Sequence, residues 1–506
     1  MKSVSKILAF FLVFIVSVCS LVACSDSKFK TANTENAPDY SNSTDEFTIW
    51  SYGATCNNWY QWKGVRYYFA ESLQTEEHTR WYKEANFNLL FIDYTFQANT
   101  SLNSYDFENS ELKEVMDMAN EQGLKCIIFN NNIHALSNST ELRINPDKAD
   151  GVNFFESEDA YAERVKYLLR GAIDHEAFYG VTLLDEAPYN KMPALGEIYK
   201  VIKKACGDKE TFIMVNILPY ADNSNSHKVS YCGSTDTSSE EAYQKYLETY
   251  YEYIGQYAGY VQYDDYPILS DNTVLSSYLY NQRVISEFCK EKGLKRHMVF
   301  QTCKYSNRRA PEEADMYFQL NLGQAFGTKN YSYYTYYPTV NTNDDTLPDE
   351  TCYIVDRLGN RNPLYYSIQK LNAEMLFNSK ALMNFEYKGM TYKTKTPVPG
   401  GVGYAGKLVE NEMAKLSSYE FEVVGGNGGL VIITELYDEA RNQYGYYVVN
   451  ATTPAYSTEI KVTLKFEGFE NTQIYQNARV NNVALSDNGE VNIYLGTGRG
   501  AFVMPY

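Results

Sequence analysis

Short apolar runs alternate with amphipathic stretches between residues 46 and 378. Each run is short and almost wholly apolar, a pattern typical of a parallel strand covered on both faces. The predicted strands are Phe47–Tyr52, Phe87–Ile92, Leu124–Asn130, Tyr179–Leu184, Phe212–Leu218, Gly259–Tyr263, His297–Gln301 and Lys329–Tyr334. The predicted helices are Glu76–Ala85, Glu111–Gln122, Asp159–Ile173, Met192–Ala205, Ala242–Tyr257, Val274–Lys292, Pro311–Phe326 and Asn362–Phe377.

This strict alternation predicts an α/β fold, a (β/α)8 TIM barrel spanning residues 46–400. A doubly wound open sheet is the alternative. It usually places a glycine-rich phosphate loop after its first strand, and this chain has none there.

The pattern of apolar and polar residues changes after residue 400. Glycine-rich turns such as 425–429 separate runs in which apolar and polar residues alternate, for example Ile460–Phe466. This pattern predicts a small antiparallel β-sandwich over residues 401–506. Accessory packing and sugar binding are both open as its role.

The first residues form a targeting segment. Lys2 and Lys6 precede an apolar stretch, Ile7–Ala23, as in a secretory signal peptide. Its end, Leu21-Val22-Ala23-Cys24, resembles the lipobox of bacterial lipoproteins, which implies cleavage after residue 23 and a lipid on Cys24. The protein would then be anchored at the extracytoplasmic face of the cell membrane, with polar residues 24–45 as a flexible tether. An ordinary signal peptide or a single membrane anchor is the alternative.

Composition excludes several classes of function. The formal net charge is −18. Removal of residues 1–23 takes away two lysines and no acidic residue, which gives −20. Such a chain is unsuited to nucleic acid or to charge-driven membrane binding. The cysteines form no CxxC pair and the histidines no HxH or HExxH pair, so we expect no structural zinc and no catalytic metal. No cofactor is predicted, and an oxygen-ligated calcium stays open as the alternative.

The stretch FYGVTLLDEAPY, residues 178–189, carries the strongest chemical signal. Its apolar run ends in two neighbouring acids, Asp185 and Glu186, and Pro188 prevents further pairing. Catalytic acids of barrel enzymes lie at such strand ends. The alternative is structural, with Asp185 capping the next helix and Glu186 facing water.

The other predicted strand ends carry acids, amides and aromatic rings. Sugar hydroxyls bind to polar groups of this kind, and the apolar faces of sugar rings stack on aromatics. Two further tryptophans, Trp59 and Trp62, follow the first strand and either form a sugar platform or pack beneath their loop. The predicted substrate-binding residues at the strand ends are Trp50, Asp93, Asn130, Asn131, Asp265, Tyr266, Gln301, Tyr333 and Tyr334. Tyr52 and Asn216 also end predicted strands, without an assigned role.

Three segments together resemble a glycoside-hydrolase barrel: residues 178–189, YVQYDDYP at 260–267, and the run 299–338. The likeness is to bacterial sugar-active lipoproteins with a DEP-like fourth strand and a YDxYP sixth strand, near the clan that includes β-galactosidases. It covers residues 46–380 and implies a carbohydrate substrate. Here one residue is inserted into DEP, giving Asp185-Glu186-Ala187-Pro188. The resemblance implies that Glu186 is the general acid.

One departure from that family concerns the second carboxylate. Retaining members of the clan carry a nucleophilic glutamate at the end of strand seven, where this chain has Gln301. Asp264 is the predicted base or nucleophile, with Asp185 as the third catalytic candidate; Asp265 and Asp93 are further substitutes. Hydrolysis with either stereochemical outcome stays open, as does a glycan-binding lipoprotein that has lost its catalytic function.

Overall fold

The computed structural model describes residues 31–54, 75–92, 106–304, 306–337, 353–356, 359–396 and 406–506, together with the backbone of strands β2 (Trp59–Trp62) and β3 (Val65–Tyr68). Eight parallel strands form one sheet in the order β1-β10-β9-β8-β7-β6-β5-β4. Their bounds are β1 Thr48–Ser51, β4 Leu89–Ile92, β5 Lys125–Phe129, β6 Phe178–Leu184, β7 Phe212–Ile217, β8 Tyr260–Asp264, β9 Lys295–Gln301 and β10 Thr328–Tyr334.

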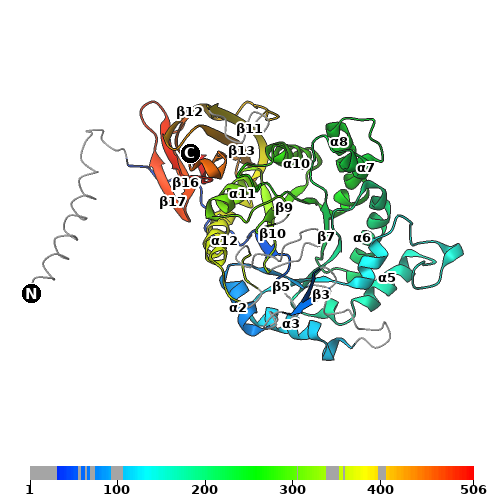
Figure 1. The fold of residues 1–506 in the computed structure, drawn as a ribbon. Coiled ribbons are helices and arrows are strands. Elements are labelled where there is room, and N and C mark those ends of the chain that lie inside the picture. Colours follow the sequence, from blue (N-terminus) through cyan, green and yellow to red (C-terminus); the bar gives the residue numbers. More distant parts are fainter. Residues whose placement is uncertain are drawn as a thin grey trace, which may run out of the picture.

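The two ends of this sheet, β1 and β4, meet through Asn88. Its backbone N–H donates to the Ile49 carbonyl at 3.0 Å, and its Oδ1 accepts from the Ile49 N–H at 2.8 Å. The sheet is therefore a nearly closed barrel with helices around it (Figure 1). The prediction of a TIM barrel followed by an antiparallel β-domain is confirmed.

Helices cover the outside of the barrel at all eight predicted places, and serine caps begin several of them. Ser110 and Ser157 each accept a hydrogen bond from a backbone N–H of the first turn, and Ser238 forms a capping box with Glu241. The helices flanking the barrel are α2 Glu76–Glu84, α3 Glu111–Glu121, α4 Asn131–Ser137, α5 Glu158–Leu168, α6 Met192–Cys206, α7 Asn225–Cys232, α8 Ser239–Tyr250, α10 Tyr278–Lys292, α11 Glu313–Ala325 and α12 Pro363–Leu382. The short helices α4 and α7 are additions to the sequence prediction.

The C-terminal part contains a six-stranded sheet, ordered β11-β13-β14-β19-β16-β17, and a three-stranded sheet, β12-β15-β18. Strand β11 begins at Glu386, so this domain starts before the predicted boundary at residue 400. The strands are β11 Glu386–Lys395, β12 Leu416–Gly425, β13 Gly429–Asp438, β14 Gln443–Asn450, β15 Glu459–Phe466, β16 Asn471–Gln476, β17 Arg479–Ala484, β18 Glu490–Leu495 and β19 Gly500–Pro505.

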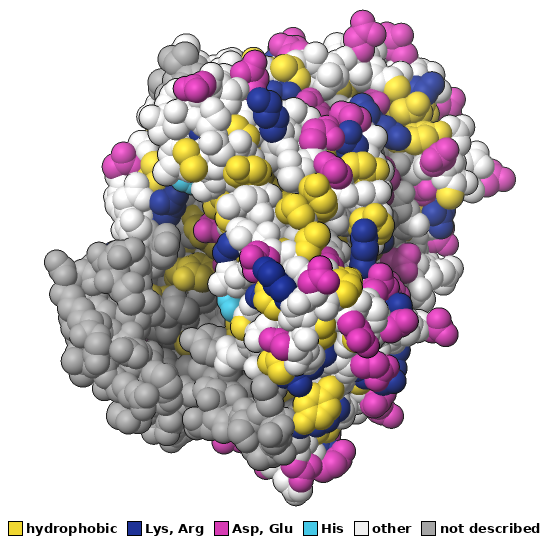
Figure 2. All heavy atoms as spheres, turned by 90° about the vertical axis from the view of Figure 1, so that its right-hand side faces the viewer, with side chains coloured by type: hydrophobic (Ala, Val, Ile, Leu, Met, Phe, Trp, Pro, Cys, Tyr) yellow, Lys and Arg dark blue, Asp and Glu magenta, His cyan; other side chains and the backbone are white. Residues whose placement is uncertain are grey.

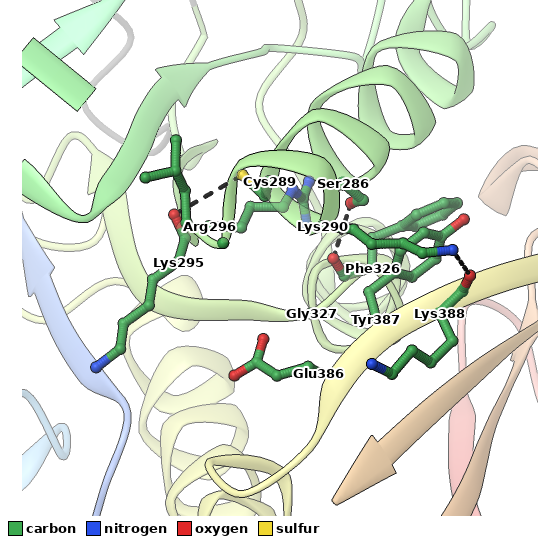
Figure 3. A pocket seen from close by; sticks show the side chains of 12 residues that line it. Ser286, Cys289, Lys290, Lys295, Arg296, Phe326, Gly327, Glu386, Tyr387 and Lys388 are labelled. Carbon is green, nitrogen blue, oxygen red and sulfur yellow. Dashed lines mark hydrogen bonds between the residues drawn. The ribbon is translucent and has the colours of Figure 1, made fainter. Parts of the chain in front are cut away.

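The larger C-terminal sheet packs on helix α11 of the barrel (Figure 1). Tyr447 on β14 donates from its hydroxyl to Oδ1 of Asn321 at 2.8 Å, and Thr434 on β13 donates to the carbonyl of Ala325 at 2.6 Å. A cavity of about 360 Å³ lies beside this junction, between α10, the start of β9 and the start of β11 (Figure 3). In that cavity the Lys290 ammonium donates to the carbonyl of Lys388, which ties α10 to β11.

The segment before β1 is docked on the C-terminal domain. Tyr40 is buried, its ring lies 5.6 Å from that of Phe385, and its hydroxyl donates to Oδ2 of Asp438 at 3.0 Å. The backbone N–H of Asn33 donates to the side chain of Asn471. The prediction of a flexible tether through residue 45 is therefore wrong for this part. No helix in the part of the chain described here has the length and apolar character needed to cross a membrane.

Candidate active site

The two acids of the opening motif lie directly after β6, at the carboxyl end of the barrel. Residues Gly180–Leu184 are buried, whereas Asp185 and Glu186 reach solvent. Glu186 has a φ of 49°, in the left-handed region that non-glycine residues occupy at a cost in free energy. Such strain is concentrated at functional sites, where the surrounding structure enforces it. Here the buried carbonyl of Ala187 accepts a hydrogen bond from Tyr246 on α8 and holds the turn.

Asn216 joins the acid of strand β6 to the acid of strand β8. Its Nδ2 donates to Oδ1 of Asp185 at 2.9 Å and to Oδ1 of Asp264 at 2.8 Å. Asn216 is 1% exposed and Asp264 is 5% exposed. One amide nitrogen thus supplies both of its hydrogens to two carboxyl groups that come from different strands, and it fixes how they face each other.

Glu186 and Asp264 lie close enough for each to influence the pKa of the other. Although Glu186 reaches solvent, protein surrounds it on its other sides, and this burial together with the charge of Asp185 raises its pKa to about 7. Burial, Glu186 and Asp185 raise the pKa of Asp264 well above its ordinary value. The pair therefore holds a proton at a pH where isolated carboxyls have lost it.

Asp185 is the carboxyl of this cluster with the most stabilising neighbours for its anion. Burial raises its pKa, but Asn216, the backbone N–H of Glu186 and the side chain of His134 all act in the opposite direction. His134, on α4, has its Nδ1 within 2.9 Å of the Leu183 carbonyl. Because a carbonyl only accepts, Nδ1 carries the hydrogen. This bond positions the ring near Asp185.

Three tyrosines border the acid cluster. Tyr52, which follows β1, is near enough to Asp185, Asp264 and Glu186 that their charges, after burial, raise its pKa. Its ring centroid is 6.3 Å from that of Tyr334, and Tyr334 stacks on Tyr266 at 5.4 Å. Tyr266 and Tyr334 are half-buried. A carboxyl cluster beside accessible aromatic faces is a suitable arrangement for a sugar ring.

Strand alternation removes Asp265 and Tyr333 from the site. Neighbouring residues of a strand point to opposite faces, so the residues beside Asp264 and Tyr334 point outward. Asp265 accepts from Asn281 of α10 at 3.0 Å, and burial raises its pKa to about 6. Tyr333 donates to Asn372 of α12 at 2.6 Å. Their predicted contact with substrate is wrong, because both pack against the helices.

Trp50 and Asn130 also have structural roles in place of the predicted substrate contact. Trp50 is fully buried in the barrel interior and donates from Nε1 to Oδ1 of Asn330 at 2.8 Å. Asn130 is buried and caps α4, with its Oδ1 accepting from two backbone N–H groups and its Nδ2 bonded to Leu168. Every polar atom of these two side chains is thereby occupied.

Gln301 is not placed to replace a nucleophile. Its Oε1 accepts from the N–H of Ile268, and its Nε2 lies 2.7 Å from the carbonyl of Arg309 and 3.3 Å from those of Ile268 and Cys303. The Gln301 side chain therefore links the loop after β8 to the loop after β9 through hydrogen bonds. The sequence-based expectation that Gln301 contacts substrate is wrong.

The structure does not test the predicted role of several site residues. Asp93 and Cys24 lie outside the described residues, and Trp59 and Trp62 end strand β2, of which only the backbone is described. Asn131 is half-buried and begins α4. The sequence predicts Tyr52 and Asn216 at strand ends but assigns neither a role in the site. The signal for Asn216 was a polar residue inside the apolar run FIMVNIL.

Within the described ranges, no three His, Cys, Asp or Glu side chains gather as a possible metal-binding group. One face of the molecule is shown in Figure 2, where acidic and basic side chains are interspersed and a hollow opens beside the residues that are not described. No broad basic patch is visible on this face.

No family model matches the chain, and no curated protein matches it. Solved structures that are similar to it include the endo-β-1,4-mannanase of Thermotoga petrophila, at 12% identity and a TM-score of 0.40, covering 90% of this chain and 99% of that one. A family 5 glycoside hydrolase of Bacteroides vulgatus has 10% identity and a TM-score of 0.45, covering 91% and 88%. A family 39 glycoside hydrolase of Bacteroides cellulosilyticus has 12% identity and a TM-score of 0.41, covering 85% and 78%. These similar structures are glycoside hydrolases, but at such identities and TM-scores they assign no activity or residue role to this chain.

Proposed function

We propose that this chain hydrolyses glycosidic bonds, with Glu186 as the general acid. The observation that supports this most is the cluster of three acids, in which Asn216 bridges Asp185 and Asp264 and the neighbouring Glu186 has a raised pKa. Glycoside hydrolysis needs one carboxyl that stays protonated and a second that is ionised. The pKa of Glu186, about 7, keeps a proton available on it at neutral pH.

The second carboxyl has two candidates. The sequence predicts Asp264 as the base or nucleophile, but burial and the acidic neighbours of Asp264 disfavour its anion. Asp185 accepts from Asn216 and from the Glu186 N–H, so it supplies the stabilised anion of the cluster. We assign Asp185 the task of stabilising positive charge at the anomeric carbon, and Asp264 the exchange of a proton with Glu186.

The distance between the general acid and the second carboxyl determines the stereochemistry of hydrolysis. Retaining pairs are separated by about 5–5.5 Å and inverting pairs by about 6.5–9.5 Å. The anomeric form of the first product, followed by proton NMR, distinguishes retention from inversion.

Location and substrate belong to the same proposal. The lipobox-like end at Cys24 supports a lipid-anchored protein on the extracytoplasmic face of the membrane, where oligo- or polysaccharides are the substrates. Mass spectrometry of the mature protein tests this placement, because a lipoprotein would begin at a diacylated Cys24. An unmodified N-terminus at another residue would contradict it.

A glycan-binding protein without catalysis is the second candidate, and Gln301 favours it because strand β9 supplies no carboxylate. The deciding experiment is a panel of aryl glycosides and oligosaccharides assayed with wild type and Glu186→Gln. Hydrolysis by wild type that falls at least a hundredfold in the variant supports the enzyme. Binding of the panel without release of product by either protein supports the second candidate.

A further inference from the structure

A row of four polar side chains crosses the inside of the barrel. Asn216 on β7 is in register with Gln262 on β8, Gln262 with His297 on β9, and His297 with Asn330 on β10. Register partners of parallel strands project from the same face of a sheet. That face is the inner one, because Asn216 bonds to Asp264 and Asn330 accepts from Trp50 inside the barrel.

The barrel interior has a polar half, which this row forms, and an apolar half. The apolar half is a cluster of five side chains, as in an ordinary barrel core: Trp50, Leu89, Phe91, Ile127 and Met214. The polar half is no less buried: Gln262 is 0% exposed and His297 8%. A buried amide costs free energy unless it forms hydrogen bonds.

Four of the eight side-chain polar atoms in this row are buried without a protein partner. Among the described residues, Oδ1 of Asn216, both amide atoms of Gln262 and Nδ1 of His297 are buried without one. The atoms occur on three successive strands, so they form one connected set. Buried polar atoms of native proteins are bonded to protein or to ordered water, and several unpartnered atoms in one row indicate water.

The two ends of the row reach opposite mouths of the barrel. Asn216 holds the acid cluster at the carboxyl end of the strands. His297 and Asn330 line a cavity of about 370 Å³ that also includes Asp45, Lys203 and Glu210, near the amino ends of the strands. Since barrel strands tilt against the axis, a row perpendicular to the strands climbs from one mouth towards the other.

We propose that a file of buried water molecules runs along Asn216, Gln262, His297 and Asn330 and connects the acid cluster with the cavity at the opposite mouth. The role of this water file rests on the proposed function. The file would keep the acid cluster in proton exchange with solvent while a bound sugar covers the cluster at the carboxyl end of the barrel. A proton that leaves the Glu186–Asp264 pair passes through the water file to the cavity, and one from the cavity replaces it.

The chemistry of the row fits water better than an ion or a sugar. Its side chains are two asparagines, a glutamine and a histidine, which offer both donors and acceptors and no formal negative charge. Neighbouring strands lie about 4.8 Å apart, so a single water reaches the side chains of two strands. The ring of His297 stacks on that of Tyr260, with 4.4 Å between the ring centroids.

The structural test is a high-resolution crystal structure of the whole chain, with Gln262→Leu beside the wild type. We expect ordered water within hydrogen-bond distance of both Asn216 Oδ1 and Gln262 in the wild type. We expect this water to be lost in the variant, together with a lower Tm. A dry wild-type interior, or a variant with a higher Tm because an unpaired amide has been removed, overturns the proposal.

The functional test uses the same variant on a substrate that the wild type hydrolyses. Gln262→Leu should lower kcat at least fivefold with KM within twofold, because Gln262 does not contact the sugar. Ile127→Val, in the apolar half of the same interior, is the matched control and should leave both constants within twofold. An unchanged kcat in Gln262→Leu overturns the proton-exchange role. If the wild type hydrolyses nothing, the proposed function fails, while the crystallographic result still decides on the water file.

Discussion

Asn216 donates from Nδ2 to Oδ1 of Asp264 at 2.8 Å, and the same nitrogen serves Asp185. The two acids come from strands on either side of Asn216 in the barrel, β6 and β8. Their carboxyl groups are therefore oriented by a neutral amide, which lowers their pKa values less than a cation in its place would.

Removal of that amide should destabilise the protein. In Asn216→Leu two carboxyls lose their shared donor; a hydrogen bond to a charged carboxylate contributes about 1.5–3 kcal/mol and one to a protonated carboxyl about 1 kcal/mol. We expect the free energy of unfolding in urea at pH 7 to fall by about 3 kcal/mol. Asn378→Leu is the control, because Asn378 donates to a single neutral partner, Gln324, and should cost about 1 kcal/mol. Equal losses in the two variants would argue against the bridging role.

The raised pKa of Glu186 has a consequence for stability. Folding raises this pKa from 4.5 to about 7, so the folded state binds the proton more tightly than the unfolded chain. The stabilisation is complete below pH 4.5 and is lost as the pH rises to 7. Glu186→Gln removes this loss and should be more stable than wild type at pH 8, by about 1–2 kcal/mol after allowance for solvent screening.

Urea unfolding of wild type and Glu186→Gln at pH 4, 6 and 8 measures that difference, and it should disappear towards pH 4. Exposed Glu252 provides the control, since Glu252→Gln should leave the difference near zero at every pH. A constant offset between wild type and Glu186→Gln over this range would contradict the raised pKa.

A glutamate placed at the end of strand β9 should not create a nucleophile. In Gln301→Glu the three carbonyls that now accept from Nε2 would face a carboxylate oxygen. We expect a loss of about 2–4 kcal/mol in the free energy of unfolding and no gain in the rate of glycoside hydrolysis. Gain of activity on aryl glycosides at unchanged stability would show that the side chain faces the substrate after all.

The aromatic residues should separate into two classes. Tyr334→Ala removes a half-buried ring stacked on Tyr266 and should raise KM about tenfold, because a stacked ring contributes about 0.5–1.5 kcal/mol beyond its buried area. Trp50→Phe removes an interior hydrogen bond to Asn330, so it should lower Tm and leave KM unchanged. Steady-state kinetics and thermal unfolding of both variants check this. A raised KM in Trp50→Phe would return it to the substrate site.

The barrel could be predicted from sequence because each of its strands is a short apolar run between amphipathic helices. All eight predicted strands are present, each displaced by no more than two residues at either end. The beginning of the C-terminal domain was less accessible, since β11 has the sequence EYKGMTYKTK, without the apolar run or glycine turns that marked the later strands. Its place in that sheet depends on pairing with β13, which lies far along the chain.

The candidate site was predicted at the level of strand ends but not of side-chain direction. Asp264 and Asp265 are adjacent in sequence, yet the first faces the acid cluster and the second faces α10. Only the register of β8 decides between them, and a single sequence does not give register to one residue. Gln301 illustrates the same limit, because its partners belong to two loops whose conformations arise from tertiary packing.

The docking of Tyr40 on the C-terminal sheet sets how such a protein would stand on a membrane. With the proposed lipid on Cys24, eight residues lie between the anchor and Asn33, where the chain is already bonded to Asn471. A fully extended chain of that length reaches about 30 Å. The β-sandwich would therefore lie next to the bilayer, with the barrel on its far side. So short an anchored segment would restrict the protein to glycans in the layer just above the cell surface.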